Sequence, residues 1–187
     1  MPAPLRVARD LELRSLKLAD APALFALVDA NRAHLRRWLP WVDANTGVAH
    51  TRAFIRLHQS LERQAQVRTF ALWWKGSLVG VAGLHSLDPD NASASVGYWL
   101  AAEAEGRGLM AKAVARLLDL GFGPMKLHRV ELRAGVRNRR SRALAERLGF
   151  RHEGTARGAQ ALHGRHIDLA VYALEAEDWP TRSPRRR

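Results

Sequence analysis

The sequence predicts an α+β fold: a single domain in which a central, mostly antiparallel mixed sheet is flanked by helices. Three observations support this prediction. The 187 residues suit one domain of ordinary size, the middle of the chain reads as short strands joined by turns, and amphipathic helical patterns lie on both sides of that stretch. With 47% hydrophobic and 26% charged residues, the composition is that of a folded globular protein.

The N-terminal third predicts one short strand followed by helices. Alternating apolar side chains indicate a strand at residues 10–16. A helix is expected to begin at Asp20, because this N-cap residue is followed by Pro22 in the first turn. A second, amphipathic helix is expected at residues 49–64. Between the two helices lies a stretch dense in aromatic and basic side chains, residues 31–41.

The rest of the domain is expected to be a meander followed by alternating helices and strands. Strands are predicted at residues 70–74, 78–84, 95–100, 129–134 and 167–174, and helices directly after Gly108 and at residues 141–148. No internal repeat and no linker precede Pro180. The domain is therefore assigned to residues 1–179, and residues 180–187 to a basic, disordered tail.

The net charge of +12 favours an acidic partner or a phosphorylated cofactor. Of the 30 basic residues, 26 are arginine, a side chain that binds phosphate and carboxylate well. The alternative is a basic, solvated surface without a dedicated partner. Charge alone does not distinguish nucleic acid, an acidic protein and a nucleotide cofactor.

Several classes of protein are not expected. No apolar run reaches the ~18–20 residues of a membrane span, and the first residues lack the apolar core of a secretory signal, so a cytoplasmic location is expected. Without cysteine there is no disulfide, thiolate metal site or thiol nucleophile. His163 and His166 are not accompanied by a cluster with ligand-like spacing, so no metal is expected.

The most informative stretch is the loop Gly106-Arg107-Gly108, which follows a predicted strand and precedes an amphipathic helix. Glycines allow close approach of the backbone, and the free N–H groups of a first helical turn attract anions. Such a loop suits a pyrophosphate. The loop lacks the Gly-Lys-Ser/Thr ending of a nucleotide triphosphatase and the third glycine of a dinucleotide fingerprint, which disfavours both of these sites.

Four motifs in the same order resemble those of the GCN5-related N-acetyltransferases (GNAT). They are Gly97-Tyr98-Trp99-Leu100, Gly106-Arg107-Gly108-Leu109-Met110, Asn138-Arg139-Arg140-Ser141 and Leu148-Gly149-Phe150. The chain is most similar to the RimJ/RimL branch, which acetylates the N-terminal amines of ribosomal proteins. The resemblance implies the GNAT fold and acetyl-CoA as cosubstrate, and it is the only indication of a homodimer.

The resemblance also implies the residues that hold acetyl-CoA. The backbone N–H groups of the pyrophosphate loop are expected from Gly106, Arg107, Gly108, Leu109 and Met110. The end of the preceding strand, Trp99 and Leu100, is expected to bond the pantetheine arm, and Asn138 to contact the cofactor. One departure is Glu105, which stands where the family usually has Gln or Arg, and which is expected to point into solvent or to pair with Arg107.

The sequence offers two candidate catalytic residues, Ser141 and His85. The resemblance implies that Ser141 donates a proton or hydrogen bond to the departing thiolate; its plain structural reading is a first-turn residue of a helix that Asn138 caps. His85, at the end of a central strand, is the candidate base, with a hydrogen-bonded edge histidine as the alternative. Glu131 reads equally well as a paired surface carboxylate, and Gln160 cannot accept a proton.

The acceptor is expected to be an acidic protein N-terminus, ribosomal proteins included. Arg36, Trp38 and Trp41 are the expected substrate-binding residues, because a basic rim beside aromatic side chains favours an acidic polypeptide. A small-amine acetyltransferase acting on an aminoglycoside, polyamine or amino acid is the alternative enzyme. A non-enzymatic RNA-binding module that stacks bases on tryptophans is a distant third reading. Neither a membrane nor direct nucleic-acid binding is expected.

Overall fold

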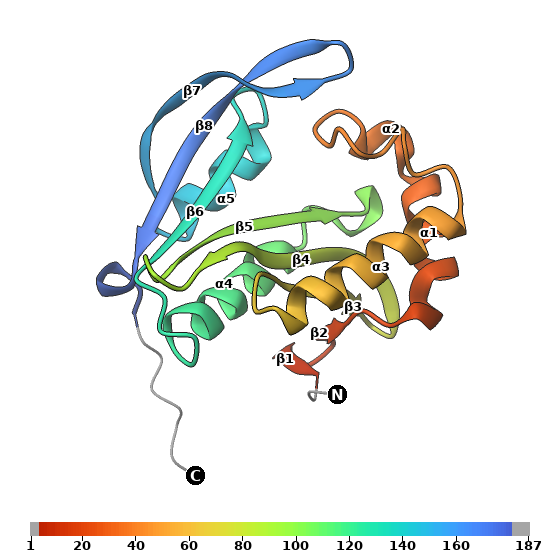
Figure 1. Ribbon diagram of the computed structural model, residues 1–187, viewed down its shortest axis with the longest axis horizontal. Coiled ribbons are helices and arrows are strands. Elements are labelled where there is room, and N and C mark those ends of the chain that lie inside the picture. The colour runs from red at the N-terminus through yellow and green to blue at the C-terminus, as the bar shows by residue number, and fades with distance from the viewer. Residues whose placement is uncertain (1–3, 181–187) are drawn as a thin grey trace.

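One eight-stranded sheet runs through the computed structural model, which describes residues 4–180. The strand order is β1-β2-β3-β4-β5-β6-β8-β7 (Figure 1). The strands are β1 (Leu5–Ala8), β2 (Leu11–Ser15), β3 (Arg68–Trp74), β4 (Ser77–Asp88), β5 (Ser93–Leu100), β6 (Arg129–Gly135), β7 (Arg151–Leu162) and β8 (Arg165–Glu175). The helices are α1 (Ala21–Ala30), α2 (Arg32–Leu35), α3 (Val48–Arg63), α4 (Leu109–Phe122) and α5 (Arg139–Arg147), with three short 3₁₀ turns at Leu18–Asp20, Ala102–Ala104 and Ala176–Asp178.

The predicted α+β class and the mostly antiparallel sheet are confirmed. Every strand pair is antiparallel except β5 with β6. The helix predicted at residues 141–148 begins earlier, because Asn138 is the N-cap and the first helical residue is Arg139. Beyond Pro180, the predicted tail lies outside the described residues.

Two strands were not predicted, β1 and β7. β7 is the edge strand of the sheet, and most of its side chains are exposed. An edge strand with so little burial carries no apolar alternation for a sequence pattern to detect. β1 has only four residues, too few to show a period. Both strands therefore form because they pair with a neighbouring strand, and their own sequences show no apolar alternation that predicts them.

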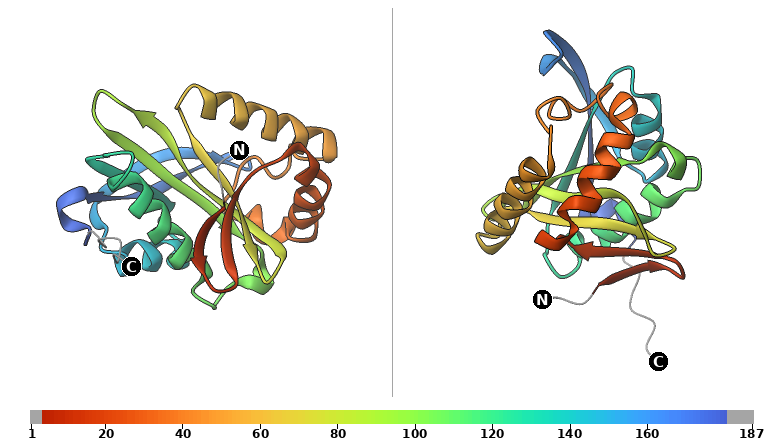
Figure 2. Two further views of the ribbon diagram at one scale, coloured as in Figure 1. Left: turned by 90° about the horizontal axis from the view of Figure 1, so that it is seen from below. Right: turned by 90° about the vertical axis from the view of Figure 1, so that its right-hand side faces the viewer.

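The sheet lies between two layers of helices, as Figure 2 shows. Helices α4 and α5 cover one face, where the larger core cluster includes Val114, Leu117 and Leu144. Helices α1 and α3 cover the other face, where Leu24 and Ile55 are buried. Strand β4 contributes buried side chains to the core on both faces of the sheet, because successive side chains of a strand point to opposite faces. Within residues 4–180, no helix combines the length and apolar composition that a membrane crossing requires.

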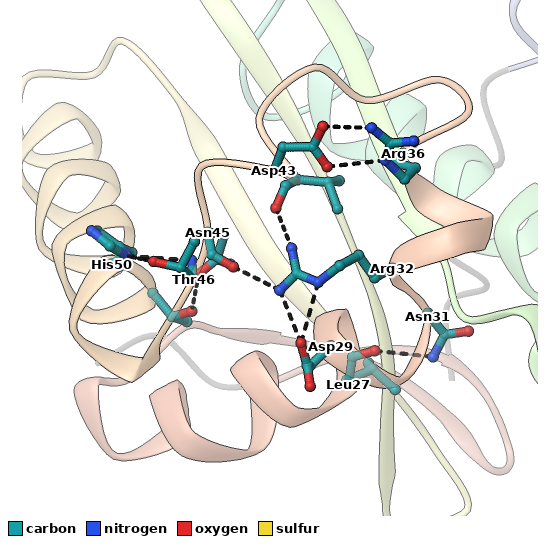
Figure 3. Close-up of polar contacts among 11 residues, drawn as sticks. Leu27, Asp29, Asn31, Arg32, Arg36, Asp43, Asn45, Thr46 and His50 are labelled. Atoms are coloured by element: carbon teal, nitrogen blue, oxygen red, sulfur yellow. Dashed lines mark hydrogen bonds and ion pairs between the residues drawn. The ribbon is translucent and has the colours of Figure 1, made fainter. Parts of the chain in front are cut away.

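The connection between α1 and α3 is held by the side chain of Arg32 (Figure 3). Its guanidinium donates to the carboxylate of Asp29 at 2.9 Å, to the carbonyl oxygen of Val42 at 2.6 Å and to that of Asn45 at 2.8 Å. The acceptors come from the end of α1 and from the second half of the loop that leads into α3. Arg32, which belongs to the basic segment predicted from the sequence, is thus a structural residue of this loop and does not stand free at a rim.

Replacing Arg32 by Lys is expected to loosen residues 36–47. Lysine keeps the charge but cannot donate in three directions from one planar group, and each lost hydrogen bond of a charged group is worth about 1.5–3 kcal/mol. Amide hydrogen exchange in this segment should become faster. The matched variant is Arg37→Lys, at an exposed neighbour for which the described residues offer no ion pair. Equal exchange rates in the two variants would contradict the structural role of Arg32.

Candidate active site

The sheet opens between β5 and β6. These two strands pair over only three positions, Ser93 with Arg129, Ala94 with Val130 and Ser95 with Glu131. Beyond Ser95, β5 continues beside β4, whereas β6 continues beside β8. The two halves of the sheet diverge from this point, as the ribbon shows (Figure 1). The divergence leaves one edge of β5 without a partner strand.

The free edge of β5 presents the backbone of Tyr98 and Leu100. The N–H of Ala101 donates to the Val79 carbonyl at 2.8 Å, and Trp99 lies opposite Val81 on β4. In antiparallel pairing the hydrogen-bonding direction alternates along a strand, so the backbone groups of Tyr98 and Leu100 point away from β4, into the opening. Of the two residues predicted here, Leu100 therefore presents its backbone groups to the opening, as does Tyr98, whereas those of Trp99 point to β4.

The start of α4 offers a row of unpaired backbone donors beside this edge. None of the described residues accepts a backbone hydrogen bond from the N–H groups of residues 106–111; the first such bond is from Lys112 to Gly108. Gly106 and Gly108 have φ values of +75° and +70°, and a Cβ at either glycine would meet no atom within 4 Å. Leu109 and Met110 are buried, so only their N–H groups face the loop. A row of free donors at a helix N-terminus is an anion cradle.

The acidic residue of this loop is neutralised by partners that the sequence did not suggest. Glu105 pairs with Arg140 of α5, and its carboxylate lies 3.4 Å from Nε2 of His34 in α2. Burial, together with two nearby arginines, lowers the pKa of His34, so at neutral pH the ring is neutral and Arg140 is the charged partner of Glu105. Arg107 lies over the ring of Trp74, 5.1 Å from its centroid. The expected pairing of Glu105 with Arg107 is therefore not formed.

Ser141 faces Tyr98 across the opening. The two hydroxyl oxygens are 2.8 Å apart, and burial raises the pKa of Tyr98 to about 12, so the phenol is protonated. When Tyr98 donates in this pair, the hydroxyl proton of Ser141 is free for another acceptor. The side-chain oxygen of Asn138 accepts from the N–H of Ser141 at 3.2 Å, which is the N-cap role expected for it. Ser141 is thereby fixed through both backbone and side chain.

His85 lies on the opposite face of the sheet from this pair. It is half-buried and sits against Gly97 of β5, where a Cβ would come within 3.1 Å of the imidazole. Glycine at position 97 therefore lets the ring lie directly on the backbone that borders the opening. Burial lowers the pKa of His85, and a backbone hydrogen bond at Gly97 opposes part of that shift. The ring is neutral at neutral pH and available as a proton acceptor.

The aromatic segment predicted to bind the acceptor borders the same face. The rings of Trp41 and Trp99 lie 6.3 Å apart, and Trp41 remains 38% exposed. The ring of Trp38 packs against Gly135 of β6, where a Cβ would lie 3.3 Å from it. Trp41 thus lies beside Trp99 of β5 and Trp38 beside β6, and these are the two strands that border the opening. Both residues come from the α2–α3 connection.

Arg36, in contrast, is already paired. Its guanidinium donates to both carboxylate oxygens of Asp43, at 3.0 and 2.7 Å (Figure 3). The carbonyl of Arg36 lies 2.5 Å from Nε2 of His163, whose Nδ1 is 3.1 Å from Asp43. Gln160 also donates to the carbonyl of Trp38 at 3.0 Å. These contacts join the α2–α3 connection to the β7–β8 hairpin.

The remaining groups considered from the sequence have structural partners. Glu131 accepts from Arg133 at 2.6 Å, which matches the reading of a paired carboxylate. Asp168 accepts from the N–H of Gly158 across an irregular part of β7. Among residues 4–180, no three His, Asp or Glu side chains are grouped as a metal site would require.

Sequence reasoning missed three residues of this site: Tyr98, His58 and Arg140. Tyr98 belongs to the Gly97–Leu100 motif, but Ser141 is 43 residues away in the sequence, and no local pattern indicates that the two hydroxyl groups meet. His58 reads as one polar position of an amphipathic helix, yet its ring lies 6.0 Å from that of His85. Arg140 is one of many arginines, and only the packing of α5 brings it to Glu105.

Comparison with known proteins agrees with this geometry. A family model described as an acetyltransferase (GNAT) domain matches residues 10–151. The protein YdaF of Bacillus subtilis (strain 168) is 35% identical over 176 residues, which cover 93% of this chain and 96% of YdaF. The ribosomal-protein-serine acetyltransferase of Escherichia coli (strain K12) is 26% identical over 169 residues, which cover 90% of this chain and 94% of the relative.

A solved structure extends the agreement to the fold. RimL, a ribosomal L7/L12 alpha-N-protein acetyltransferase in complex with coenzyme A, superposes with a TM-score of 0.90 at 28% sequence identity. The match covers 92% of this chain and 98% of that one. Fold, family match and relatives all confirm the resemblance found in the sequence motifs. The chain belongs to the GNAT acetyltransferase family.

Proposed function

We propose that this chain transfers the acetyl group of acetyl-CoA to the α-amine at the N-terminus of a ribosomal protein. The supporting observation is the opening between β5 and β6, which has the anion cradle of residues 106–111 on one side and the aromatic rings of Trp41 and Trp99 with the neutral His85 on the other. The E. coli relative acts on a ribosomal-protein serine, and the RimL structure contains coenzyme A. Such an acceptor implies a cytoplasmic enzyme, since ribosomal proteins are made and assembled there.

The residues present fit the cosubstrate, which supplies the acetyl group as a thioester. The N–H groups of residues 106–111 would hold its pyrophosphate, with the positive end of the α4 dipole behind them. The open space at Gly106 and Gly108 leaves room for close approach. The outward backbone groups of Tyr98 and Leu100 would bond the pantetheine amides. With Glu105 neutralised by Arg140, its carboxylate does not repel the pyrophosphate.

Ser141 is positioned to protonate or hydrogen-bond the departing thiolate. It stands at the first turn of α5, where the helix dipole favours negative charge, and Tyr98 fixes its hydroxyl. Asn138 holds its backbone and also borders the opening. The two readings of Asn138 and Ser141, helix start and functional site, are therefore compatible.

His85 is positioned to take the proton of the acceptor amine, directly or through one water. An α-amine has a pKa of about 7.7–8.0, whereas that of a lysine side chain is about 10.4. A neutral imidazole with a lowered pKa is a weak base, sufficient for an α-amine and poorly matched to a lysine. This match favours a protein N-terminus over an internal side chain.

The cofactor cradle is tested by Gly108→Asp, which places bulk and negative charge at the pyrophosphate. Loss of hydrogen bonds to a charged group, at about 1.5–3 kcal/mol each, predicts at least a tenfold rise in the Kd of acetyl-CoA. The matched control is Gly164→Asp in the β7–β8 turn, where φ is +78° and the Cβ position is equally open. Calorimetry with each variant should show weakened binding only for position 108. Unchanged affinity at position 108 would refute the cradle.

The role of Ser141 is tested by Ser141→Ala. An interaction that matters mainly in the transition state lowers kcat and leaves the Kd of acetyl-CoA unchanged. We expect a loss in kcat of about 10²-fold, the low end for general acid catalysis. Tyr98→Phe, which removes only the partner hydroxyl, should give a smaller loss. A stable Ser141→Ala variant with the kcat of the wild type would leave Ser141 as a helix-turn residue.

The acceptor is tested by comparing kcat/KM for an acidic, Ser- or Ala-initiated peptide with spermidine and an aminoglycoside. Arg37→Glu is the appropriate charge reversal, because a glutamate at position 36 would face Asp43 and disturb the loop. Charged residues at the rim of a binding site act mainly on the rate at which the partner is encountered and on the salt dependence of binding. The variant should raise the KM of the peptide and flatten its salt dependence. Turnover of the small amines alone would overturn the protein acceptor and leave the family and cofactor assignments intact.

A further inference from the structure

A second histidine lies beside His85, on a different element. His58 projects from α3 onto the face of β4, and the centroids of the two rings are 6.0 Å apart at an interplanar angle of 84°. Both rings are half-buried. His58 therefore lies on the α3 side of His85.

The ring of His58 is fixed on two further sides. Phe54, one turn earlier on α3, lies with its ring centroid 4.1 Å from that of His58. The Nδ1 atom of His58 is 2.8 Å from the hydroxyl oxygen of Thr69, a β3 residue with only 3% exposure. With Nδ1 occupied by Thr69, Nε2 is the ring nitrogen left for proton exchange. A surface histidine without function has no need of a buried hydroxyl partner.

The charges around the pair do not fix a proton on either ring. In the described part of the chain no carboxylate forms an ion pair with His58 or His85, whereas a carboxylate oxygen lies within 3.4 Å of His34 and within 3.1 Å of His163. Arg68 of β3 donates to the carbonyls of Glu62 and Val67. Burial lowers the pKa of His58, and the neighbouring His85 lowers it further. Two imidazoles this close resist carrying two positive charges at once.

We propose that His58 is a positioning and relay residue for His85, so that the two imidazoles act as one base that accepts a single proton from the acceptor amine. This inference rests on the proposed function. As the amide N–C bond forms and the thioester C–S bond breaks, one proton leaves the amine nitrogen. His85 accepts it, one water molecule carries it to Nε2 of His58, since no direct hydrogen bond joins the two rings, and solvent beside α3 receives it. Ser141 serves the thiolate on the other face.

The test is the pH dependence of kcat/KM for the acceptor peptide in wild type, His58→Phe and His58→Asn. Below the pKa of the acceptor amine, the rate already falls by one proton. Protonation of one ring of the pair adds a second proton to the wild-type acid slope, and protonation of the other ring, which the first charge delays to lower pH, adds a third. His58→Phe keeps the packing on Phe54, and His58→Asn retains a polar partner for Thr69. Both should lower kcat about tenfold, less than the 10²–10⁴-fold of a primary base, and remove the third proton from the acid slope. Acceptor KM should remain unchanged.

The matched control is His50→Phe. His50 is an exposed residue of the same helix, and its Nδ1 also lies close to a threonine hydroxyl, that of Thr46, at 3.2 Å (Figure 3). It should leave kcat and the acid slope unchanged. Thr69→Val, which removes the hydroxyl at equal volume, should reproduce part of the His58 defect. If His58→Phe folds and keeps the wild-type kcat and slope, the proposal is wrong.

A readout independent of activity separates this proposal from the proposed function. Titration of the imidazole protons by NMR should give a higher pKa for His58 in His85→Gln than in wild type, because the neighbouring charge is removed. An unchanged titration of His58 would overturn the pairing even if the enzyme is active. Conversely, a wild type that acetylates no α-amine would refute the proposed function, and the NMR titration would still decide whether the rings are coupled.

Discussion

The short parallel pairing of β5 with β6 is the constraint on which the rest of the site depends. Only three residue pairs join the two halves of the sheet. Each half is then held by its own antiparallel partners, β4 for β5 and β8 for β6. The opening is therefore bordered by two rigid edges, and the unpaired backbone groups of β5 need polar partners. An extended ligand with amides along its length supplies such partners, which explains why a gap in a sheet can serve as a binding site.

The alternation of side chains along β5 divides the chemistry between the two faces of the sheet. Tyr98 points to the α4–α5 face and fixes Ser141. Gly97 and Trp99 point to the other face, where His85 and Trp41 lie. One strand thus contacts both the group that we propose to serve the thiolate and the group that we propose to take the amine proton. Because successive residues of a strand point in opposite directions, Ser141 and His85 are separated by the thickness of the sheet. The two side chains therefore do not exchange a proton directly.

The net charge of +12 overstates the positive charge that is free at the surface, because several arginines are engaged in contacts within the protein. Arg32 and Arg36 are engaged in ordering the acceptor-side loop, and Arg140 neutralises Glu105 beside the anion cradle. Arg142 donates to the hydroxyl of Tyr172, a buried core residue. Arginine suits these internal roles because its planar group donates in several directions. The positive charge that remains for an acidic acceptor lies on exposed arginines such as Arg37.

The sequence by itself determined the fold class, most of the elements, the family and the loop at Gly106–Gly108, because each depends on local patterns: period, caps, turns and short motifs. It could not reveal β7, whose exposed side chains show no period, or the partners of Glu105, Arg36 and Tyr98. These contacts join residues as many as 127 positions apart, and only packing of the sheet and helices brings them together. The same holds for His58 and His85, which come from a helix and a strand 27 residues apart and meet only because α3 lies along β4. Local physics specifies the elements, and the distances between their side chains are decided by the tertiary structure alone.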